Sequence, residues 1–253
     1  MAMAAAAGLG WPGLYRDNPL VTAGWRGNDV VTLVVAVPAL TLARQSARRG
    51  SATGHLLWIG LVDYALYGYL FYLFGSALNA AFLLYVVVVT AASAALVQGI
   101  ATALSGGIGR ALATAPAGGV AVFLALLAAG LGTVHLSALV GFVATGQLPA
   151  IVSAVAHPTH VIAALDLWLV VAWSAVAAYG VWRRRPLGFV LAAAVTVKGA
   201  FYMAALAAAT VAAWQAGAGP DVSQAGLWIA IGVACAAAAT RLLRPVRGLT
   251  ASG

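Results

Sequence analysis

Hydrophobic positions fill long stretches of this chain, and short polar or glycine-rich segments separate them. Seven of these stretches are long enough to cross about 30 Å of hydrocarbon as a single helix. Each therefore predicts one transmembrane span. The expected bounds are 29–47, 54–75, 77–104, 118–145, 158–182, 187–216 and 224–243.

The stretches have the pattern of helices rather than of barrel strands. They are almost continuously apolar and rich in alanine and leucine, whereas a barrel strand alternates polar and apolar residues over about ten positions. A helix also satisfies its own backbone hydrogen bonds in lipid. Pro38 lies inside the first stretch and predicts a kink there. The sequence thus predicts an all-α integral membrane bundle of seven transmembrane helices.

Composition supports the membrane interpretation. Of 253 residues, 64% are hydrophobic and only 7% are charged, whereas about a quarter of the residues in a soluble domain are charged. No water-soluble surface can be built from so few charges. We expect an extracytoplasmic N-terminal segment (1–28), a transmembrane domain (29–243) and a cytoplasmic tail (244–253).

The arginines predict the orientation of the bundle. Ten of them fall in alternate loops or at the end of the chain, and only Arg16 and Arg26 lie on the other side. The positive-inside rule then places the N-terminus outside and the C-terminus in the cytoplasm, in a bacterial plasma (inner) membrane. Anionic lipid explains the net charge of +8 better than nucleic acid does. The ten are Arg44, Arg48, Arg49, Arg110, Arg183, Arg184, Arg185, Arg241, Arg244 and Arg247.

Three charged residues are predicted near the middle of the membrane: Asp63, Asp166 and Lys198. At 1.5 Å per residue they lie roughly 13, 12 and 16 Å from the nearest predicted helix end. A charge at this depth is costly unless it is paired. We therefore expect helices two, five and six to converge, with Lys198, the only lysine, paired with Asp166. A purely structural role for this pair is the alternative.

Further polar residues are candidates for the same site. Tyr67 lies one turn from Asp63 and could donate to its carboxylate. Asn79 lies near the outer end of the second helix, His135 lies in the outer half of the fourth, and Asp29 begins the predicted first helix. Asp29 is either a helix cap or a residue of the outer cavity, with Arg26 as its partner.

Histidines are the only candidates for a metal. His157 and His160 lie one turn apart at the start of the fifth stretch, and His135 lies in the outer half of the fourth. They are weak candidates as ligands of a metal or a haem, because no HExxH or carboxylate–histidine motif accompanies them. We predict no metal site. The single cysteine, Cys235, makes neither an intrachain disulfide nor a cysteine cluster.

Four segments resemble a group of bacterial polytopic membrane proteins for which no activity is established. The segments read GLYRDNPLVTAGWRGNDVVTL, YLFYLFGSALNAAFLLYV, ALDLW and RRRPLGFVLAAAVTVKG, and the resemblance spans most of the chain. It implies no substrate or cofactor. It places Asp29, Asn79, Asp166 and Lys198 inside recognisable motifs. Retinal proteins are a poorer match, because their lysine lies on helix seven and here helix seven has none.

The pattern favours a small-molecule or ion transporter, or a ligand-binding membrane protein, over an enzyme. Midplane carboxylates near a lysine are typical of proton relays and ion pathways. An intramembrane enzyme or a haem- or metal-binding redox subunit is one alternative, and an accessory or sensory subunit is another. The cofactor is left open. Expected partners are the lipid bilayer, a small ligand and further copies of the chain packed through faces of small residues.

Overall fold

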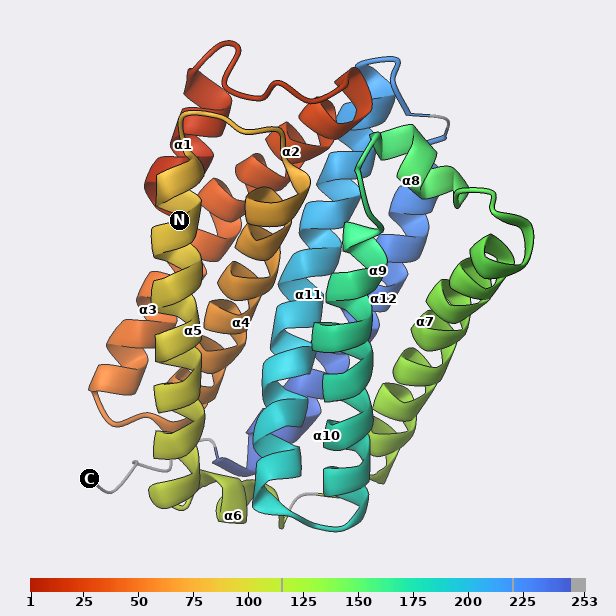
Figure 1. The fold of residues 1–253 in the computed structure, drawn as a ribbon. Coiled ribbons are helices and arrows are strands. Elements are labelled where there is room, and N and C mark those ends of the chain that lie inside the picture. Colours follow the sequence, from red (N-terminus) through yellow and green to blue (C-terminus); the bar gives the residue numbers. More distant parts are fainter. Residues whose placement is uncertain (115, 220, 247–253) are drawn as a thin grey trace.

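The computed structural model describes residues 1–114, 116–219 and 221–246, and within these ranges it contains helices and no strands (Figure 1). Seven helices are long and apolar enough to cross a membrane, as predicted. They are Pro19–Arg48 (α2 Pro19–Val31, η1 Thr32–Ala36 and α3 Val37–Arg48), α4 Ala52–Gly75, α5 Phe82–Ser105, α7 Gly118–Thr145, Val161–Trp182 (α9 Val161–Leu165, η2 Asp166–Val171 and α10 Ala172–Trp182), α11 Pro186–Gln215, and Gln224–Val246 (α12 Gln224–Leu243 and η3 Arg244–Val246). The short helices α1 Ala2–Gly10, α6 Ile108–Leu112 and α8 Ala150–Val155 lie between or before them.

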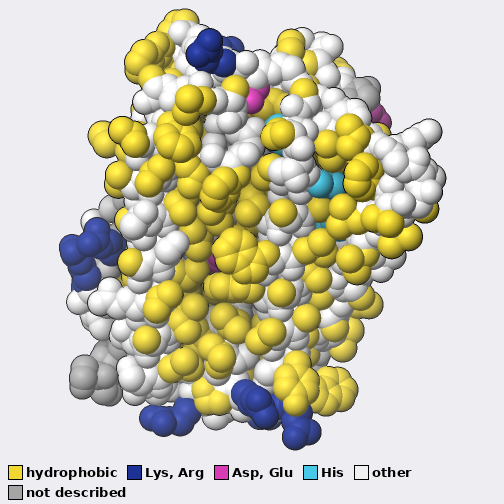
Figure 2. Space-filling model, viewed as in Figure 1, with side chains coloured by type: hydrophobic (Ala, Val, Ile, Leu, Met, Phe, Trp, Pro, Cys, Tyr) yellow, Lys and Arg dark blue, Asp and Glu magenta, His cyan; other side chains and the backbone are white. Residues whose placement is uncertain are grey.

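The two ends of the bundle differ in charge. We call the lower end in Figure 1 the basal end, because the α3–α4, α5–α7 and α10–α11 connections lie there and carry Arg49, Arg110 and Arg183–Arg185. The apical end carries α8 and the α11–α12 connection. Figure 2 shows hydrophobic side chains over most of the visible face and Lys or Arg side chains along its lower edge. This distribution fits a multi-pass membrane protein.

Helices α4 and α11 form the centre of the bundle. In their most apolar windows 83% and 61% of the residues are buried, against 17% in Pro19–Arg48 and 22% in α5. Helix α11 packs against α2, α4, α10 and α12. Large apolar side chains on the outer helices face outward, among them Leu83, Val97, Leu126 and Val143. Such exposure suits lipid, so the polar side chains of α4 and α11 must be satisfied inside the protein.

The first span begins at Pro19 rather than at the expected residue 29. Asn18 caps it by accepting a hydrogen bond from Val21 N–H, and Pro19 occupies its first turn. The polar residues of the first span up to position 29 resemble a loop in the sequence, but Asp29 is buried against the bundle. The expected extracytoplasmic segment 1–28 therefore contributes helical structure to the bundle itself.

The N-terminal helix α1 packs against α2 and η1. Its nine residues span about 13 Å, half of a membrane. Tyr69 Oη donates to the Met1 carbonyl at 3.0 Å, and a Cβ on Gly8 would overlap the Asp29 carboxylate and the Tyr15 hydroxyl. Helix α1 is thus packed inside the bundle beside α2, although it precedes the first full span. At the other terminus, residues 247–253 of the expected tail lie outside the described residues.

Other predicted bounds differ by a few residues. The third span begins at Phe82 instead of 77, because residues 76–81 form a turn. The fifth begins at Val161 instead of 158. A π-helical segment, η1, ends two residues before Pro38, where a kink is predicted. A second π-helical segment, η2, interrupts the fifth span, and no sequence pattern predicted it.

Two glycines allow α10 and α11 to meet closely near the basal end. A Cβ built on Gly180 would lie 2.5 Å from the Cα of Gly188. Neither helix can carry a side chain at this crossing.

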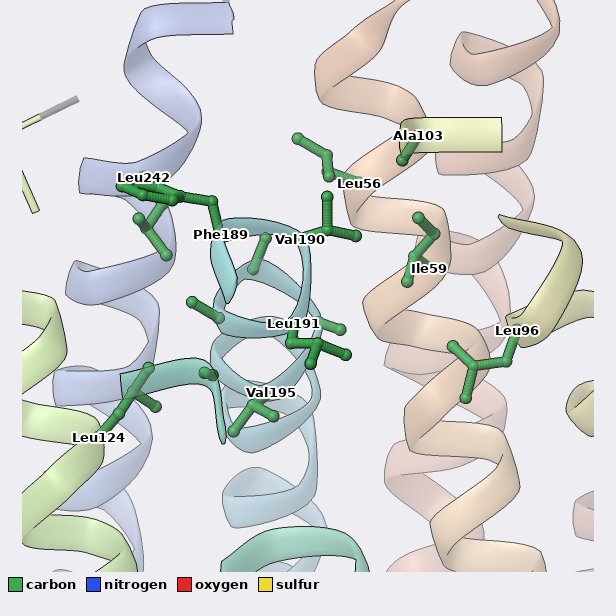
Figure 3. Close-up of a cluster of buried hydrophobic side chains, with 14 of the residues drawn as sticks. Leu56, Ile59, Leu96, Ala103, Leu124, Phe189, Val190, Leu191, Val195 and Leu242 are labelled. Atoms are coloured by element: carbon green, nitrogen blue, oxygen red, sulfur yellow. The ribbon is translucent and has the colours of Figure 1, made fainter. Parts of the chain in front are cut away.

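A packed apolar layer closes the basal half of the bundle (Figure 3). It contains side chains from α4, α5, α7, α11 and α12, and Leu56, Ile59, Leu124, Phe189 and Leu242 in it are fully buried. We refer to these five residues, with Val190 and Leu191, as the basal core.

Replacing Gly180 with alanine is expected to destabilise the bundle by about 1–3 kcal/mol, the usual cost of overpacking. The added methyl group would meet the backbone of α11, which cannot move away as a side chain can. Thermal unfolding in detergent, followed by fluorescence-detected size exclusion, measures the change. Gly130→Ala is the matched control, because nothing lies within 4 Å of a Cβ at Gly130. Equal melting temperatures for the two variants would contradict the close crossing.

Candidate ligand cavity

Lys198 is held by three elements near the middle of the bundle. Its Nζ lies 3.1 Å from Asp63 Oδ2 on α4 and donates to the Leu169 carbonyl in η2 at 3.0 Å. The ammonium also lies 5.1 Å from the ring centre of Tyr67 and 5.9 Å from that of Trp173, within cation–π range. Lys198 and Asp63 are almost completely buried. The predicted convergence of helices two, five and six is therefore present, and it satisfies the lysine.

The partner of Lys198 is Asp63, and the expected pairing with Asp166 is wrong. The fifth span begins three residues later than expected, so Asp166 lies nearer the apical end than its predicted depth. Leu169, three residues further along the span, is the residue at the level of Lys198. Because this segment is π-helical, the Ala172 N–H bonds to the carbonyl five residues back, at Leu167. The Leu169 carbonyl that accepts from Lys198 lies within this π-helical segment.

Asp166 belongs to a second polar layer, one helical turn closer to the apical end. Tyr67 Oη donates to Asp166 Oδ1, and His135 Nε2 on α7 lies 2.8 Å from Asp166 Oδ2. The rings of Tyr67 and Tyr202 meet edge to face at 4.7 Å. Tyr67 follows Asp63 by one turn and Tyr202 follows Lys198 by one turn, which places both tyrosines at this level. The expected hydrogen bond from Tyr67 to Asp63 is replaced by the one to Asp166.

A cavity of about 540 Å³ lies above these layers. Lys198 and Asp166 line it together with Tyr67, His135 and Tyr202, and most of its remaining lining is apolar. It extends apically to Asp221 and Gln224, which are exposed, so the cavity reaches the surface there. Its volume is typical of small-molecule sites. The basal core lies on its other side, beyond Val195.

The wall of the cavity includes α7, which leans away from α9 and α10 toward the apical end (Figure 1). Leu131 and Val134 on α7 line the cavity opposite Ile162 and Val170 of the fifth span. The short helix α8 adds Ile151 from above. Histidine side chains are visible in Figure 2 toward this end.

Asp29 lies outside the cavity in an aromatic cluster. Its carboxylate accepts from the Tyr15 hydroxyl and, at 2.9 Å, from Tyr72 Oη, rather than pairing with Arg26. Tyr69 and Tyr85 complete the cluster around Tyr72. Burial and the neighbouring carboxylate raise the pKa of the Tyr15 phenol, so that this donor keeps its proton. Asp29 is thus neither a helix cap nor a cavity residue.

Asn79 also lies outside the cavity. Its amide donates to the Ala77 carbonyl at 3.1 Å and its carbonyl accepts from Ala81 N–H at 3.0 Å, which holds the turn before α5. Asp17 supports the same turn by accepting from Ala77 N–H and from Trp25 Nε1. The structure gives Asn79 a local structural role.

His135 and His157 both line the cavity, but the three histidines do not gather at one point in it. The rings of His135 and His160 are 5.8 Å apart, whereas His157 lies against Gly75, where a Cβ would be 3.2 Å from its Cε1. Within the described residues, no three His, Cys, Asp or Glu side chains are placed so that they could hold a metal ion together. His160 instead caps α9, because its Nδ1 accepts from Ala163 N–H at 3.2 Å.

Several contributors to the cavity were missed from the sequence. Tyr202 had a signal, because it lies one turn from Lys198 on the same helix. Trp25, Asn28 and Trp228 also line the cavity, but they lie on the first and last spans, whose rotation the sequence does not fix. The Leu169 carbonyl is a backbone group and has no sequence signal.

Known proteins give no further guide to the site. The chain matches no protein-family model, no curated protein and no solved structure. The resemblance to a bacterial group stays a prediction, and function must be inferred from the geometry.

Removing the charge of Lys198 alone is expected to destabilise the protein by about 3–5 kcal/mol, because Lys198→Met leaves Asp63 buried and unpaired. The double variant Lys198→Met/Asp63→Asn removes both charges and is expected to recover much of this loss. Thermal unfolding of the wild type, both single variants and the double variant forms a double-mutant cycle. Additive losses in that cycle would show that the pair contributes nothing.

Acid is expected to loosen the start of α9. Burial, and then the neighbouring His135, lower the pKa of His160 below its ordinary value of 6.5. The neutral ring is therefore favoured in the folded protein. Stability from this group is complete above pH 6.5 and falls as the pH drops toward the folded-state pKa. A protonated Nδ1 cannot accept from Ala163 N–H, and a lost N-cap costs about 1 kcal/mol.

His160→Asn keeps an N-cap acceptor without a titrating ring. Melting temperatures measured from pH 7.5 to 5 are expected to fall less in this variant than in the wild type. His157→Asn is the comparison variant, because the pKa of His157 is also lowered by burial but its ring caps no helix. Identical acid profiles for wild type and His160→Asn would refute the assignment.

Proposed function

We propose that this chain is a bacterial plasma-membrane protein that binds a small molecule from outside the cell and carries it across the membrane. The proposal rests on one observation above all. A cavity of about 540 Å³ reaches the charged centre of a seven-helix bundle from the apical end, and a packed apolar core closes the basal end.

Orientation comes from the arginines. Under the positive-inside rule the basal end, with Arg110 and Arg183–Arg185, faces the cytoplasm. The apical end and the mouth of the cavity then face outward. In this arrangement the two polar layers form the floor of an outward-open site.

The chemistry of the floor suits a carrier. Buried ionisable residues in a membrane bundle mark ion and substrate pathways more often than they serve packing. Here they occur at two adjacent levels that share Tyr67, which bonds to Asp166 and covers Lys198. A ligand that alters the upper layer therefore acts on the salt bridge of the lower one. Transport also requires the basal core to open, because its buried side chains, Phe189 among them, leave no path to the cytoplasm in this state.

Sided cysteine labelling tests this proposal. In a Cys235→Ala background, Thr210→Cys places a thiol on the cavity wall toward its mouth. We expect a membrane-impermeant methanethiosulfonate to modify it from outside in spheroplasts. Ser105→Cys, exposed beside the basal loop, is the control and should react only in inside-out vesicles. Labelling of Thr210→Cys from the cytoplasmic side alone would refute the outward-open cavity.

Transport across the membrane is tested by a third cysteine variant, Ala193→Cys, within the apolar layer next to the basal core. A protein that alternates between two states must expose this position to the cytoplasm for part of the time. Slow modification is therefore expected in inside-out vesicles. Complete protection, with a folded variant, would contradict transport and leave ligand binding alone.

A further inference from the structure

The charges on the cavity wall do not balance, and the imbalance is acidic. Lys198 is neutralised by Asp63, which lies behind it and does not line the cavity. Asp166 has two partners, a neutral phenol from Tyr67 and the imidazole of His135. Among the ion pairs of the described residues, none joins Asp166 to a lysine or an arginine.

Asp166 is also the charge that the cavity can reach. Its side chain is 13% exposed, whereas that of Lys198 is 3% exposed beneath Tyr67 and Trp173. A second carboxylate, Asp221, stands at the mouth. The Ser223 hydroxyl and N–H donate to it and lower its pKa, so it is ionised. A ligand entering the cavity therefore meets the Asp221 carboxylate at the mouth and the Asp166 carboxylate at the inner end.

Aromatic rings line the cavity that the Asp166 carboxylate reaches, and one of them, Tyr67, donates to that carboxylate. Trp25, Tyr67, Phe71, Tyr202 and Trp228 line the cavity, from α2, α4, α11 and α12. Ring faces attract cations, as Lys198 already illustrates at Tyr67. Together with the apolar side chains of α7, these rings fit the body of a hydrophobic ligand and leave one carboxylate to bind its charge.

We propose that the cavity binds a monovalent organic cation with an apolar or aromatic body, and that this cation replaces a proton on His135 as the counter-charge of Asp166. The inference rests on the proposed function and names its ligand class. Binding then releases one proton, from Nε2 or Nδ1 of the imidazolium, toward the mouth. No bond other than this N–H is broken.

Groups on the surrounding elements permit this exchange. Tyr67 on α4 donates to the other carboxylate oxygen, Tyr202 on α11 meets Tyr67 edge to face, and Lys198 is paired with Asp63. His160, at the start of α9, faces the ring of His135, and His157 lines the cavity beside Gly75. Cys235 on α12 contributes a thiol to the cavity wall near Lys198. His135 is thus the base in direct contact with the carboxylate that the ligand needs.

The test uses tetraphenylphosphonium, a permanent cation, against tetraphenylborate, an anion of similar shape, and neutral triphenylphosphine oxide. Binding to the purified chain in nanodiscs is measured by equilibrium dialysis, with empty nanodiscs subtracted. The cation is expected to bind best. Asp166→Asn is expected to weaken its binding by about tenfold or more, as loss of a buried charge partner does. Asp29→Asn is the charge-matched control outside the cavity and is expected to leave binding unchanged.

Proton exchange has its own readout. Apparent affinity for the cation is expected to fall on acidification, by up to about tenfold per pH unit, the limit for one competing proton. His135→Gln keeps a hydrogen-bonding side chain and is expected to flatten this dependence without removing binding. Melting temperatures check that each variant is folded.

Three results would overturn the inference. Stronger binding of the borate would assign the cavity to anions, and equal binding of the neutral oxide with no effect of Asp166→Asn would show apolar recognition only. Both would leave a ligand-binding cavity in place. Absence of binding by the cation to the folded wild type would also refute the proposed ligand class, whereas cysteine labelling decides the proposed function separately.

Discussion

Lys198 sets the central constraint on this bundle, because an ammonium in the middle of a membrane must be compensated by the protein itself. Three elements meet to do so: α4 supplies a carboxylate and the ring of Tyr67, η2 a backbone carbonyl, and α10 the ring of Trp173. No one of these is adjacent to Lys198 in sequence. The lysine therefore fixes how the second, fifth and sixth spans lie against one another.

The rest of the site follows from that arrangement. Once Lys198 and Asp63 are level, helical geometry places Tyr67 and Tyr202 one turn above them and brings Asp166 beside them. Below the lysine, small and branched residues of α11 are buried against the basal core. Above it, α7 leans away and the cavity begins. The charge pair thus marks the boundary between a sealed half and a hollow half of the same bundle.

Sequence reasoning identified the spans and the matching level of Lys198 and Asp63, because both depend on apolar length and on a fixed rise per residue. It placed the first span ten residues too late, since the polar residues of 19–28 resemble a loop until their burial is known. It also paired Lys198 with Asp166, whereas the partner in the structure is Asp63. An error of three residues at the start of a helix is almost one turn, which is enough to choose the wrong carboxylate. The π-helical carbonyl and the roles of Asn79 and Asp29 depend on tertiary contacts that no single sequence reveals.

Helix α1 has a consequence for how the protein is assembled. Its contacts are with α2, with η1 and, through the Met1 carbonyl, with Tyr69 on α4. It leaves the ribosome before any of these partners, and nine residues cannot span a bilayer alone. Its docking surface exists only after two later spans have entered the membrane and packed. We therefore expect the order of packing to differ from the order of synthesis, with α1 packing around Asp29 after those spans are in place.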